Sequence, residues 1–435
     1  MRAKSINMKL RENIRHVTSP SGEVHFLFNT DGGTWATMKQ NVYEFLQAAI
    51  SCDEDPLLLG LRMGFNHEEL NQFLSTLLDL SLLKGKDGEA SALQLSKCYF
   101  HVTEACNLTC PTCYSWRPRR NERKDDDLPT ELVGEALRQM SDLGLTELVI
   151  SGGEPLLRRD LIKILQMAKE EYRLDMVVLL TNGTLINEQN ASDIALYADV
   201  VCVSLDGLSE EMNRKIRGRG NWVKATEAIR VLKAAGARRV NLLPTLTHQN
   251  VHQMEGFLGL ADSLGATVSF SMFIGVGAGS KEQELALTAS DMLTMAKTLD
   301  KINIAQSKSI PMGCSVGLAS LAGCGIGHRV IALDHDGTVY PCHMTMKPEL
   351  RMGKFPEQSL KEIWTSSPLA THFREFNVDR FNGCSKCFVR YFCGGGCRAN
   401  AYAVSGDLLS SDPSCQFYKP VLVSMIQPIL EAGSR

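Results

Sequence analysis

The sequence predicts an α/β protein, and two observations support this fold class. Between residues 96 and 310, short apolar runs alternate six times with segments of helical spacing, which is typical of a parallel sheet with helices outside it. The flanking regions lack this alternation. We therefore predict three parts: a winged-helix-like domain at residues 1–90, a partial (β/α)6 TIM-like barrel at residues 96–310, and a loop-rich, cysteine-rich domain at residues 311–435.

The N-terminal region is predicted to place its strands before its helices. The turn sequence Ser19-Pro20-Ser21-Gly22 separates two short alternating runs. The expected strands are 14–17, 24–28 and 34–38, and the expected helices are 40–50, 56–63 and 67–83. A polar linker follows at residues 84–89.

The central region is predicted to alternate strand and helix in series. The expected strands are 98–102, 147–150, 176–180, 200–205, 240–243 and 267–272, and the expected helices are 130–143, 160–171, 188–197, 223–235, 251–264 and 289–304. In such a fold, reactive groups gather at the carboxyl ends of the strands. Beyond it, Asp334-His335-Asp336-Gly337 predicts a hairpin between strands 330–333 and 338–340.

Composition excludes several classes of partner. A net charge of −3 over 435 residues gives no electrostatic basis for nucleic-acid binding. No apolar run approaches the roughly 20 residues that span a bilayer, and the charged N-terminus lacks the apolar core of a secretory signal. We therefore expect a cytoplasmic protein without a membrane or nucleic-acid partner.

The fourteen cysteines indicate metal binding or catalysis, because disulfides are rare in a reducing compartment. Cys106, Cys110 and Cys113 form a C-x3-C-x2-C run directly after the first predicted barrel strand. Three thiolates can hold three irons of a cubane cluster and leave the fourth iron open. A structural zinc ion, the alternative, usually has four protein ligands, and this run offers three.

A second motif follows the second predicted barrel strand. Gly152 and Gly153 allow close approach of the backbone to a ligand. Glu154 adds a carboxylate suited to an ammonium group, and Pro155 ends the motif. Alone, these residues could be a simple turn; next to the cysteine run they indicate a binding site.

Together these motifs resemble the radical S-adenosylmethionine (SAM) enzyme family over residues 96–310. The resemblance implies that the three cysteines bind the catalytic cluster and that residues 152–155 bind the amino group of SAM. By the same resemblance, Asn182, Ser204, Asp206 and Arg217 are candidate SAM contacts at the ends of the next two strands and beyond them. Thr112 precedes the third cysteine, where the family commonly has an aromatic residue, so Tyr114 either takes that role or packs.

The C-terminal cysteines resemble the SPASM extension of this family, which carries two auxiliary [4Fe–4S] clusters. The resemblance implies that Cys324, Cys342 and Cys397 hold the first, with Cys314 as a candidate fourth ligand; without Cys314 that cluster has an open iron. It assigns Cys384, Cys387, Cys393 and Cys415 to the second. A zinc ribbon could use four of these thiols, but seven or eight suffice for two cubanes. The remaining Cys52, Cys98 and Cys202 are expected to be buried and inert.

The order of elements in residues 1–90 resembles the RiPP recognition element, which binds the leaders of ribosomally made precursor peptides as an added strand between its third strand and third helix. The alternative is a generic winged-helix domain. Its lack of a strong basic cluster disfavours nucleic-acid binding.

These resemblances imply a radical SAM peptide maturase that uses SAM and three [4Fe–4S] clusters, one catalytic and two auxiliary. It would abstract hydrogen from a precursor peptide and install a thioether or carbon–carbon crosslink, with flavodoxin or ferredoxin as electron donor. Formylglycine formation and epimerisation are the enzymatic alternatives, and an iron–sulfur or zinc regulatory protein is the non-enzymatic one. Sulfatase-maturing relatives tend to have an aspartate base after the cysteine that matches Cys342; here His343 follows and is either a base or a packing residue.

Overall fold

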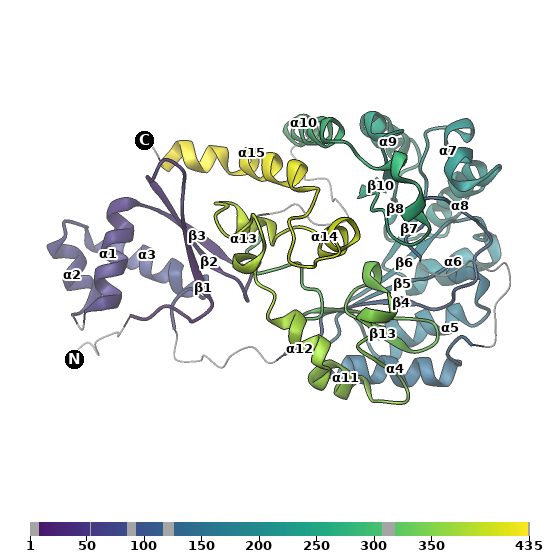
Figure 1. Cartoon of the computed structure of the whole chain (residues 1–435), viewed down its shortest axis with the longest axis horizontal. Coiled ribbons are helices and arrows are strands. Elements are labelled where there is room, and N and C mark those ends of the chain that lie inside the picture. The colour runs from purple at the N-terminus through teal and green to yellow at the C-terminus, as the bar shows by residue number, and fades with distance from the viewer. Residues whose placement is uncertain (1–7, 53, 85–92, 116–125, 307–317, 434–435) are drawn as a thin grey trace.

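The computed structural model describes residues 8–52, 54–84, 93–115, 126–306 and 318–433. Cys314 and most of the predicted linker 84–89 lie outside these residues. Figure 1 shows the N-terminal domain at one end, the barrel at the other and the cysteine-rich domain between them. Within the described chain, no helix combines the length and apolar character needed to cross a bilayer.

The N-terminal domain has the predicted order of elements. Its antiparallel sheet runs in the order β1-β2-β3. Its elements are β1 (Ile14–Thr18), β2 (Val24–Asn29), β3 (Trp35–Lys39), α1 (Gln40–Ser51), α2 (Pro56–Arg62) and α3 (His67–Asp79). Every residue of β2 is buried, because the sheet is covered on both faces. Leu27 packs under the three helices, whereas Phe26 and Phe28 pack against Phe392 of the C-terminal domain.

The barrel confirms the predicted α/β class. Its strands form a continuous parallel sheet in the order β10-β8-β7-β6-β5-β4. The strands are β4 (Lys97–His101), β5 (Glu147–Ser151), β6 (Met176–Thr181), β7 (Val200–Val203), β8 (Val240–Leu242) and β10 (Thr267–Val268). The helices in the predicted positions are α4 (Thr130–Asp142), α5 (Leu161–Gln166), α6 (Glu188–Tyr197), α8 (Asn221–Ala234), α9 (Met254–Ser263) and α10 (Ala289–Gln306).

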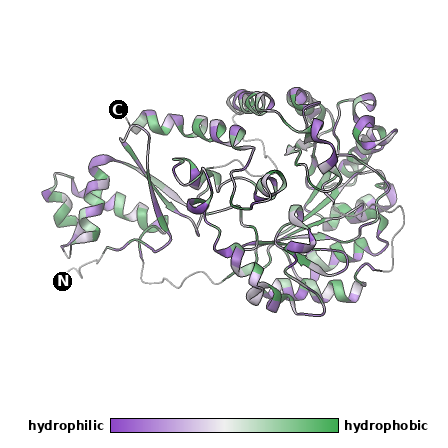
Figure 2. Cartoon of the chain, in the orientation of Figure 1, coloured by the Kyte–Doolittle hydropathy of each residue, from purple (hydrophilic) through white to green (hydrophobic). Residues whose placement is uncertain are grey.

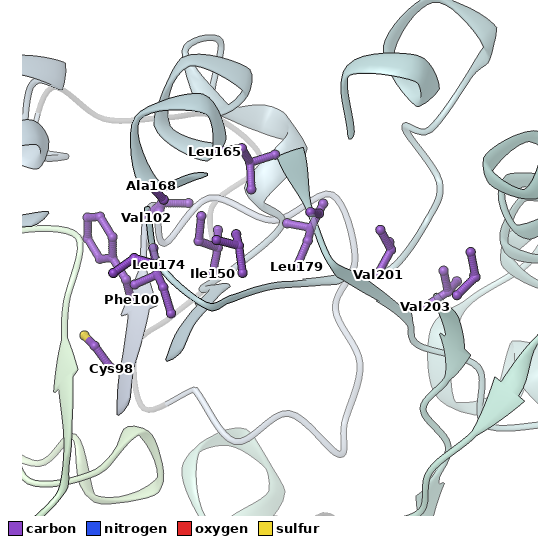
Figure 3. Packing of buried hydrophobic residues seen from close by; sticks show 14 of the residues in the cluster. Cys98, Phe100, Val102, Ile150, Leu165, Ala168, Leu174, Leu179, Val201 and Val203 are labelled. Atoms are coloured by element: carbon purple, nitrogen blue, oxygen red, sulfur yellow. The ribbon is translucent and has the colours of Figure 1, made fainter. Parts of the chain in front are cut away.

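The core of the barrel forms where apolar strand residues meet the covering helices. Figure 3 shows this packing around Cys98, Phe100, Val102, Ile150, Leu165, Leu179, Val201 and Val203. Cys98 and Cys202 are buried in this sheet, as predicted, whereas Cys52 of the N-terminal domain is half-buried rather than buried. In Figure 2 the central strands are mainly hydrophobic, while the helices carry both hydrophobic and hydrophilic residues, as expected for helices with one face against the core.

The barrel differs from the prediction in one strand and in one additional helix. The expected strand 267–272 is divided into β10 and β11 (Ser271–Met272), and β11 pairs with β9 (Thr245–Leu246). Pro244 precedes β9 and cannot donate to the ladder, although its carbonyl accepts from the Ser271 amide at 3.0 Å. The predicted helix 160–171 is confirmed as α5 and the π-helical turn η2 (Met167–Glu171) that continues it. Helix α7 (Glu210–Arg217) was not predicted, because its sequence is almost entirely polar.

The C-terminal domain extends the barrel sheet. The predicted hairpin forms from β12 (Val330–Leu333) and β13 (Thr338–Tyr340), and β12 pairs parallel with β4. The sheet ends with β14 (Gly353–Lys354). Helices α11 (Leu360–Ser366), α12 (Pro368–Arg374), α13 (Arg390–Cys393), α14 (Arg398–Ser405) and α15 (Cys415–Gly433) complete the domain, so it is less loop-rich than predicted.

Candidate active site

The three cysteines of the C-x3-C-x2-C run follow β4 and line one cavity of about 200 Å³. Cys106 and Cys110 are buried, and Cys113 is half-buried. The cavity lies at the carboxyl ends of the barrel strands. The predicted site residues that line it are Cys106, Cys110, Cys113, Gly152, Gly153, Asn182, Ser204, Arg217 and His343. Glu154, Pro155 and Asp206, also predicted, are not among the lining residues.

The two glycines hold the loop that leads to Cys106. The Gly153 amide donates to Thr103 O at 2.8 Å, and the next amide, of Glu154, donates to Ala105 O at 2.7 Å. A Cβ atom on Gly152 would lie 2.3 Å from Thr103 O, and one on Gly153 would lie 2.0 Å from Ala105 O. Only glycine permits this approach, so the second motif positions the cysteine loop as well as lining the cavity.

Glu154 points into the protein rather than into the cavity. Its carboxylate is fully buried and accepts from Thr181 Oγ1 at 2.7 Å and from the Asn182 amide at 2.8 Å. Burial raises the pKa of Glu154, although these hydrogen bonds oppose the shift. Its contacts join the end of β5 to the end of β6, so the carboxylate fixes the edge of the cavity.

A chain of amide side chains connects the cysteine loop to β6. Asn182 Nδ2 donates to Asn107 Oδ1 at 2.8 Å, and Asn107 Nδ2 donates to Thr184 Oγ1 at 2.8 Å. Thr184 in turn donates to Asn182 Oδ1. Sequence reasoning missed Asn107, although its position directly after Cys106 indicates a polar loop contact.

Arg217 supplies the positive charge of the cavity. Its Nε donates to Asp206 Oδ2 at 2.7 Å, and Asp206 Oδ1 accepts from the Thr245 amide at 2.8 Å. Burial alone would lower the pKa of Arg217, but the charges of Asp206, Cys110 and Cys106 raise it. Asp206 therefore orients Arg217 toward the thiol side of the cavity.

Tyr114 and His343 form the wall between the cavity and the C-terminal domain. The Tyr114 hydroxyl lies 2.9 Å from Ser151 Oγ and 3.3 Å from His101 Nε2, and burial raises its pKa to about 12. The His343 ring stacks on Tyr99 with 3.8 Å between centroids and meets Tyr114 edge-on. Burial is the main cause that lowers the pKa of His343 to about 3.

The described cysteines do not form a closed tetrahedral zinc site in this structure. Tetrahedral zinc with bonds of 2.3 Å brings sulfur atoms to about 3.8 Å from one another. No three described cysteines place their sulfur atoms within 4.8 Å of one another.

Four C-terminal thiols are close enough to interact electrostatically. Burial raises the pKa of Cys393 to about 12, and the charges of Cys415 and Cys384 add to the shift. Cys387 raises the pKa of both Cys384 and Cys415, after burial. These are the four cysteines predicted to share the second auxiliary cluster.

The remaining predicted ligands come from three separate segments of the C-terminal domain. Cys342 packs against the apolar cluster of Ile326, Leu350 and Phe373, and the exposed Cys324 lines a separate cavity of about 490 Å³ that Phe373 also lines. Cys397 directly precedes α14 as its N-cap residue. Cys314 lies outside the described residues.

Asp412 organises two of the predicted ligand loops and was missed at the level of sequence. Its carboxylate accepts from the amides of Cys397 at 2.5 Å and Ser414 at 2.8 Å, and from Asn400 Nδ2 at 2.7 Å. Ser414 directly precedes Cys415. The sequence Asp412-Pro413 is a turn signal that could have identified it.

The fold and site define an α/β protein whose reactive end combines an iron–sulfur thiol run with a polar cavity. The model of the radical SAM superfamily matches residues 100–261, and that of the SPASM iron–sulfur cluster-binding domain matches residues 324–388.

Known proteins of the same family are similar to this chain in sequence or in fold. The chain is 30% identical to the mycofactocin maturase MftC of Mycobacterium tuberculosis (strain CDC 1551 / Oshkosh) over 73% of this chain and 81% of that protein. It is 28% identical to the PqqA peptide cyclase of Gluconobacter oxydans over 72% of this chain and 88% of that protein. Streptococcus suis SuiB bound to precursor peptide SuiA has the same fold, with a TM-score of 0.61, 16% identity, and 94% and 100% of the two chains covered.

The chain therefore belongs to the radical SAM superfamily and carries a SPASM iron–sulfur domain. Membership implies an enzyme that uses SAM, a catalytic [4Fe–4S] cluster and auxiliary iron–sulfur clusters.

Proposed function

We propose that this enzyme modifies a ribosomal precursor peptide by radical chemistry. The observation that carries the proposal is the N-terminal sheet, whose last strand, β3, pairs only with β2 among the described strands. An unpaired strand edge can take an extended peptide as an additional strand. The names of MftC and the PqqA peptide cyclase, and the SuiB complex with its precursor peptide, support the same substrate class.

Cys106, Cys110 and Cys113 are the residues that would hold the catalytic cluster. Arg217, Ser204, Asn182 and the main chain of residues 152–153 line the space beside them and would bind SAM. The cluster, when bound, supplies the electron that cleaves SAM and thereby starts the radical reaction. Asp206 keeps Arg217 directed into the cavity, and Tyr114 closes the side next to the C-terminal domain.

The C-terminal cysteines would hold two auxiliary clusters in the sets implied by the SPASM resemblance. Cys384, Cys387, Cys393 and Cys415 form one set; Cys324, Cys342 and Cys397, with or without Cys314, form the other. These clusters would accept the surplus electron, so the product is an oxidised peptide with a thioether or carbon–carbon crosslink. The electron donor is flavodoxin or ferredoxin, and the enzyme is cytoplasmic.

The packing of His343 supports the peptide-crosslinking reaction over formylglycine formation. Its imidazole stacks on Tyr99 and meets Tyr114 edge-on, a contact that fits a packing role rather than that of a base. An aspartate base, which sulfatase-maturing relatives tend to have here, is not present in this sequence.

Anaerobic assays with the precursor peptide from a neighbouring gene test the proposal. We expect SAM cleavage on reduction and a loss of two hydrogens per crosslink in the mass spectrum. An unchanged mass with one deuterium gained in heavy water would show epimerisation instead. Purified protein that contains zinc, lacks iron and does not cleave SAM would support the regulatory alternative.

A further inference from the structure

A cavity of about 490 Å³ lies where the three domains meet, on the side of the barrel opposite the active site. Ser96 and Thr146 line it directly before β4 and β5 begin, so it lies at the amino ends of these strands. The catalytic cavity lies at their carboxyl ends. We call it the basic cavity, because its lining includes the side chains of Arg15, Lys97, Arg329 and Arg374.

The arginines of the basic cavity bind main-chain oxygens. Arg15 Nη1 donates to Glu12 O at 2.9 Å, and Arg329 and Arg374 also donate to main-chain carbonyls. In the described part of the chain, none of these three arginines forms an ion pair with a carboxylate. Their charges are therefore not compensated by side chains.

The carboxylates of the lining do not neutralise these arginines. Glu147 pairs with Lys97 at 2.8 Å, and Glu375 pairs with Arg380 at 3.6 Å. Among the described lining residues Asp31 is the one other carboxylate, and its main-chain oxygen, not its side chain, accepts from an arginine. The basic cavity therefore has an excess of positive charge, which attracts an acidic partner.

The basic cavity includes one of the cysteines assigned to the first auxiliary cluster. Cys324 is exposed and lines it. Cys342, from the same set, packs against Ile326 and Phe373, which both line the basic cavity as well. His343, the next residue, lines the catalytic cavity. The assigned ligands of this cluster thus extend from the wall of the catalytic cavity to the basic cavity on the other side of the barrel.

The crosslinking reaction leaves one electron that must be removed. The radical takes one hydrogen atom from the peptide, and closure of the new bond releases one proton and one electron from the bonded atoms. In the proposed reaction the auxiliary clusters accept this electron, and it must leave them before the next turnover. A second carrier therefore has to reach a ligand of these clusters from outside.

An acidic flavin protein is the carrier that matches the basic cavity. Opposite charges on two surfaces speed their encounter, and redox partners form small interfaces of less than about 1,200 Å². The lining also contains Phe373, Phe376 and Phe381, with 5.0 Å between the ring centroids of the first two. Aromatic rings of this kind pack well against the aromatic edge of a flavin.

We propose that an acidic flavodoxin docks on the basic cavity and removes the electron there. In this step the oxidised flavin takes one electron from the auxiliary cluster and one proton from solvent, and becomes the semiquinone. The inference rests on the proposed function and deepens it, because it assigns the face on which the carrier binds. A small anion such as pyrophosphate is the competing occupant.

The test uses the reconstituted full-length enzyme, with a recombinant bacterial flavodoxin in the oxidised state as the probe. Anaerobic calorimetry gives its Kd at about 50 mM and about 500 mM salt for wild type and for the double variant Arg15→Gln/Arg329→Gln. Arg15→Lys/Arg329→Lys keeps both charges. The matched control is Arg138→Gln/Arg230→Gln, which removes two charges from exposed arginines of α4 and α8.

We expect the Gln variant of the basic cavity to raise Kd about tenfold at low salt, while the Lys variant and the control bind as wild type does. At high salt the wild-type Kd should approach that of the Gln variant, because salt screens the attraction. In double-mixing stopped flow, enzyme reduced with stoichiometric dithionite first meets SAM and the precursor peptide and then flavodoxin. The semiquinone should form more slowly in the Gln variant.

Equal Kd values for wild type and the Gln variant would overturn the docking site. Pyrophosphate binding that the Gln variant loses, together with an unchanged Kd for flavodoxin, would assign the basic cavity to a small anion instead.

Failure of the proposed function has a different signature. Dithionite replaces flavodoxin as the reductant, so wild-type enzyme that then leaves the mass of the precursor peptide unchanged would refute the proposed function, whatever the Kd of flavodoxin. Crosslinking with dithionite, combined with an unchanged Kd in the Gln variant, would refute the docking site alone.

Discussion

Asp206 Oδ2 accepts a hydrogen bond of 2.7 Å from Arg217 Nε, and the Asp206 side chain is fully buried. The same carboxylate accepts from the Thr245 amide, so it links the end of β7 and the start of β9 to α7. Removing one partner of a buried ion pair leaves an uncompensated charge, which typically costs about 3–5 kcal/mol. The arginine of the cavity is therefore held by a residue that does not line the cavity.

Asp206→Asn should weaken SAM binding and lower the melting temperature, because the amide oxygen can accept from only one of Arg217 Nε and the Thr245 amide and its NH2 group then faces the other donor. We expect an increase in the Kd for SAM of about tenfold or more, measured by calorimetry on the reconstituted enzyme. Asp142→Asn is the control, since Asp142 pairs with Arg138 at the surface and such pairs contribute at most about 1 kcal/mol. Equal effects of the two substitutions would contradict the positioning role.

Gly153→Ala should disable the active site without unfolding the protein. The added Cβ would lie 2.0 Å from Ala105 O, so the loop that carries Cys106 must move. Displacement of a reacting group by about 1 Å can reduce a rate about a hundredfold, and we expect a fall of that order in SAM cleavage.

Gly259→Ala is the matched control for this glycine. Nothing lies within 4 Å of a Cβ at position 259 in α9, so alanine there should stabilise the helix by about 0.5–1 kcal/mol. If Gly153→Ala retained full SAM cleavage, the hydrogen bonds from residues 153 and 154 to the cysteine loop would not be needed for the site.

Cys106→Ala should abolish SAM cleavage, because the remaining two thiols of the run cannot hold three irons. Cys202→Ala removes a buried thiol outside the cavity, whose pKa burial raises to about 11. It should cost roughly 1 kcal/mol of stability and leave cleavage unchanged. Iron content and the yield of 5′-deoxyadenosine report both effects, and cleavage retained in Cys106→Ala would contradict the assignment.

Sequence patterns were enough to predict the barrel and to identify its cluster site, because both depend on residues that are close together in the chain. Apolar strands alternate with amphipathic helices, and the cluster ligands lie within eight residues. The patterns failed where tertiary contacts decide the structure. Helix α7 is almost wholly polar, and α15 forms although Pro420 and Pro428 lie inside it.

Roles that depend on contacts across the fold were also hidden in the sequence. Glu154 lies in the motif expected to meet SAM, but the structure directs its carboxylate toward Thr181 and Asn182. The all-buried β2 could have been expected from its apolar run, whereas its packing against Phe392, more than 360 residues later, could not.

Asp412→Asn should reduce the iron of the auxiliary clusters while sparing SAM cleavage. The carboxylate accepts from the amides of Cys397 and Ser414, and an amide that faces one of these donors would cost about 1–3 kcal/mol. Asp407→Asn is the control, because Asp407 is exposed and caps only its own loop. Unchanged iron content and unchanged peptide product in Asp412→Asn would show that the two ligand loops form without it.

The N-terminal domain should lose stability as the pH falls from about 6.5 to about 4. Burial, then the charges of His25 and Arg390, lower the pKa of His16 from 6.5 to about 4. His16 Nε2 lies 2.9 Å from His25 Nδ1, and its Nδ1 lies 3.2 Å from the Tyr43 hydroxyl. In that pH window the unfolded chain binds a proton at His16 and the folded chain does not, so protonation favours unfolding.

His16→Gln should flatten the dependence of melting temperature on pH between 7 and 4, because the titrating group is removed while a polar side chain remains. His67→Gln, on the exposed start of α3, serves as the control and should keep the wild-type slope. Calorimetric scans at half-unit intervals of pH measure both. A wild-type slope in His16→Gln would assign the acid sensitivity to other groups.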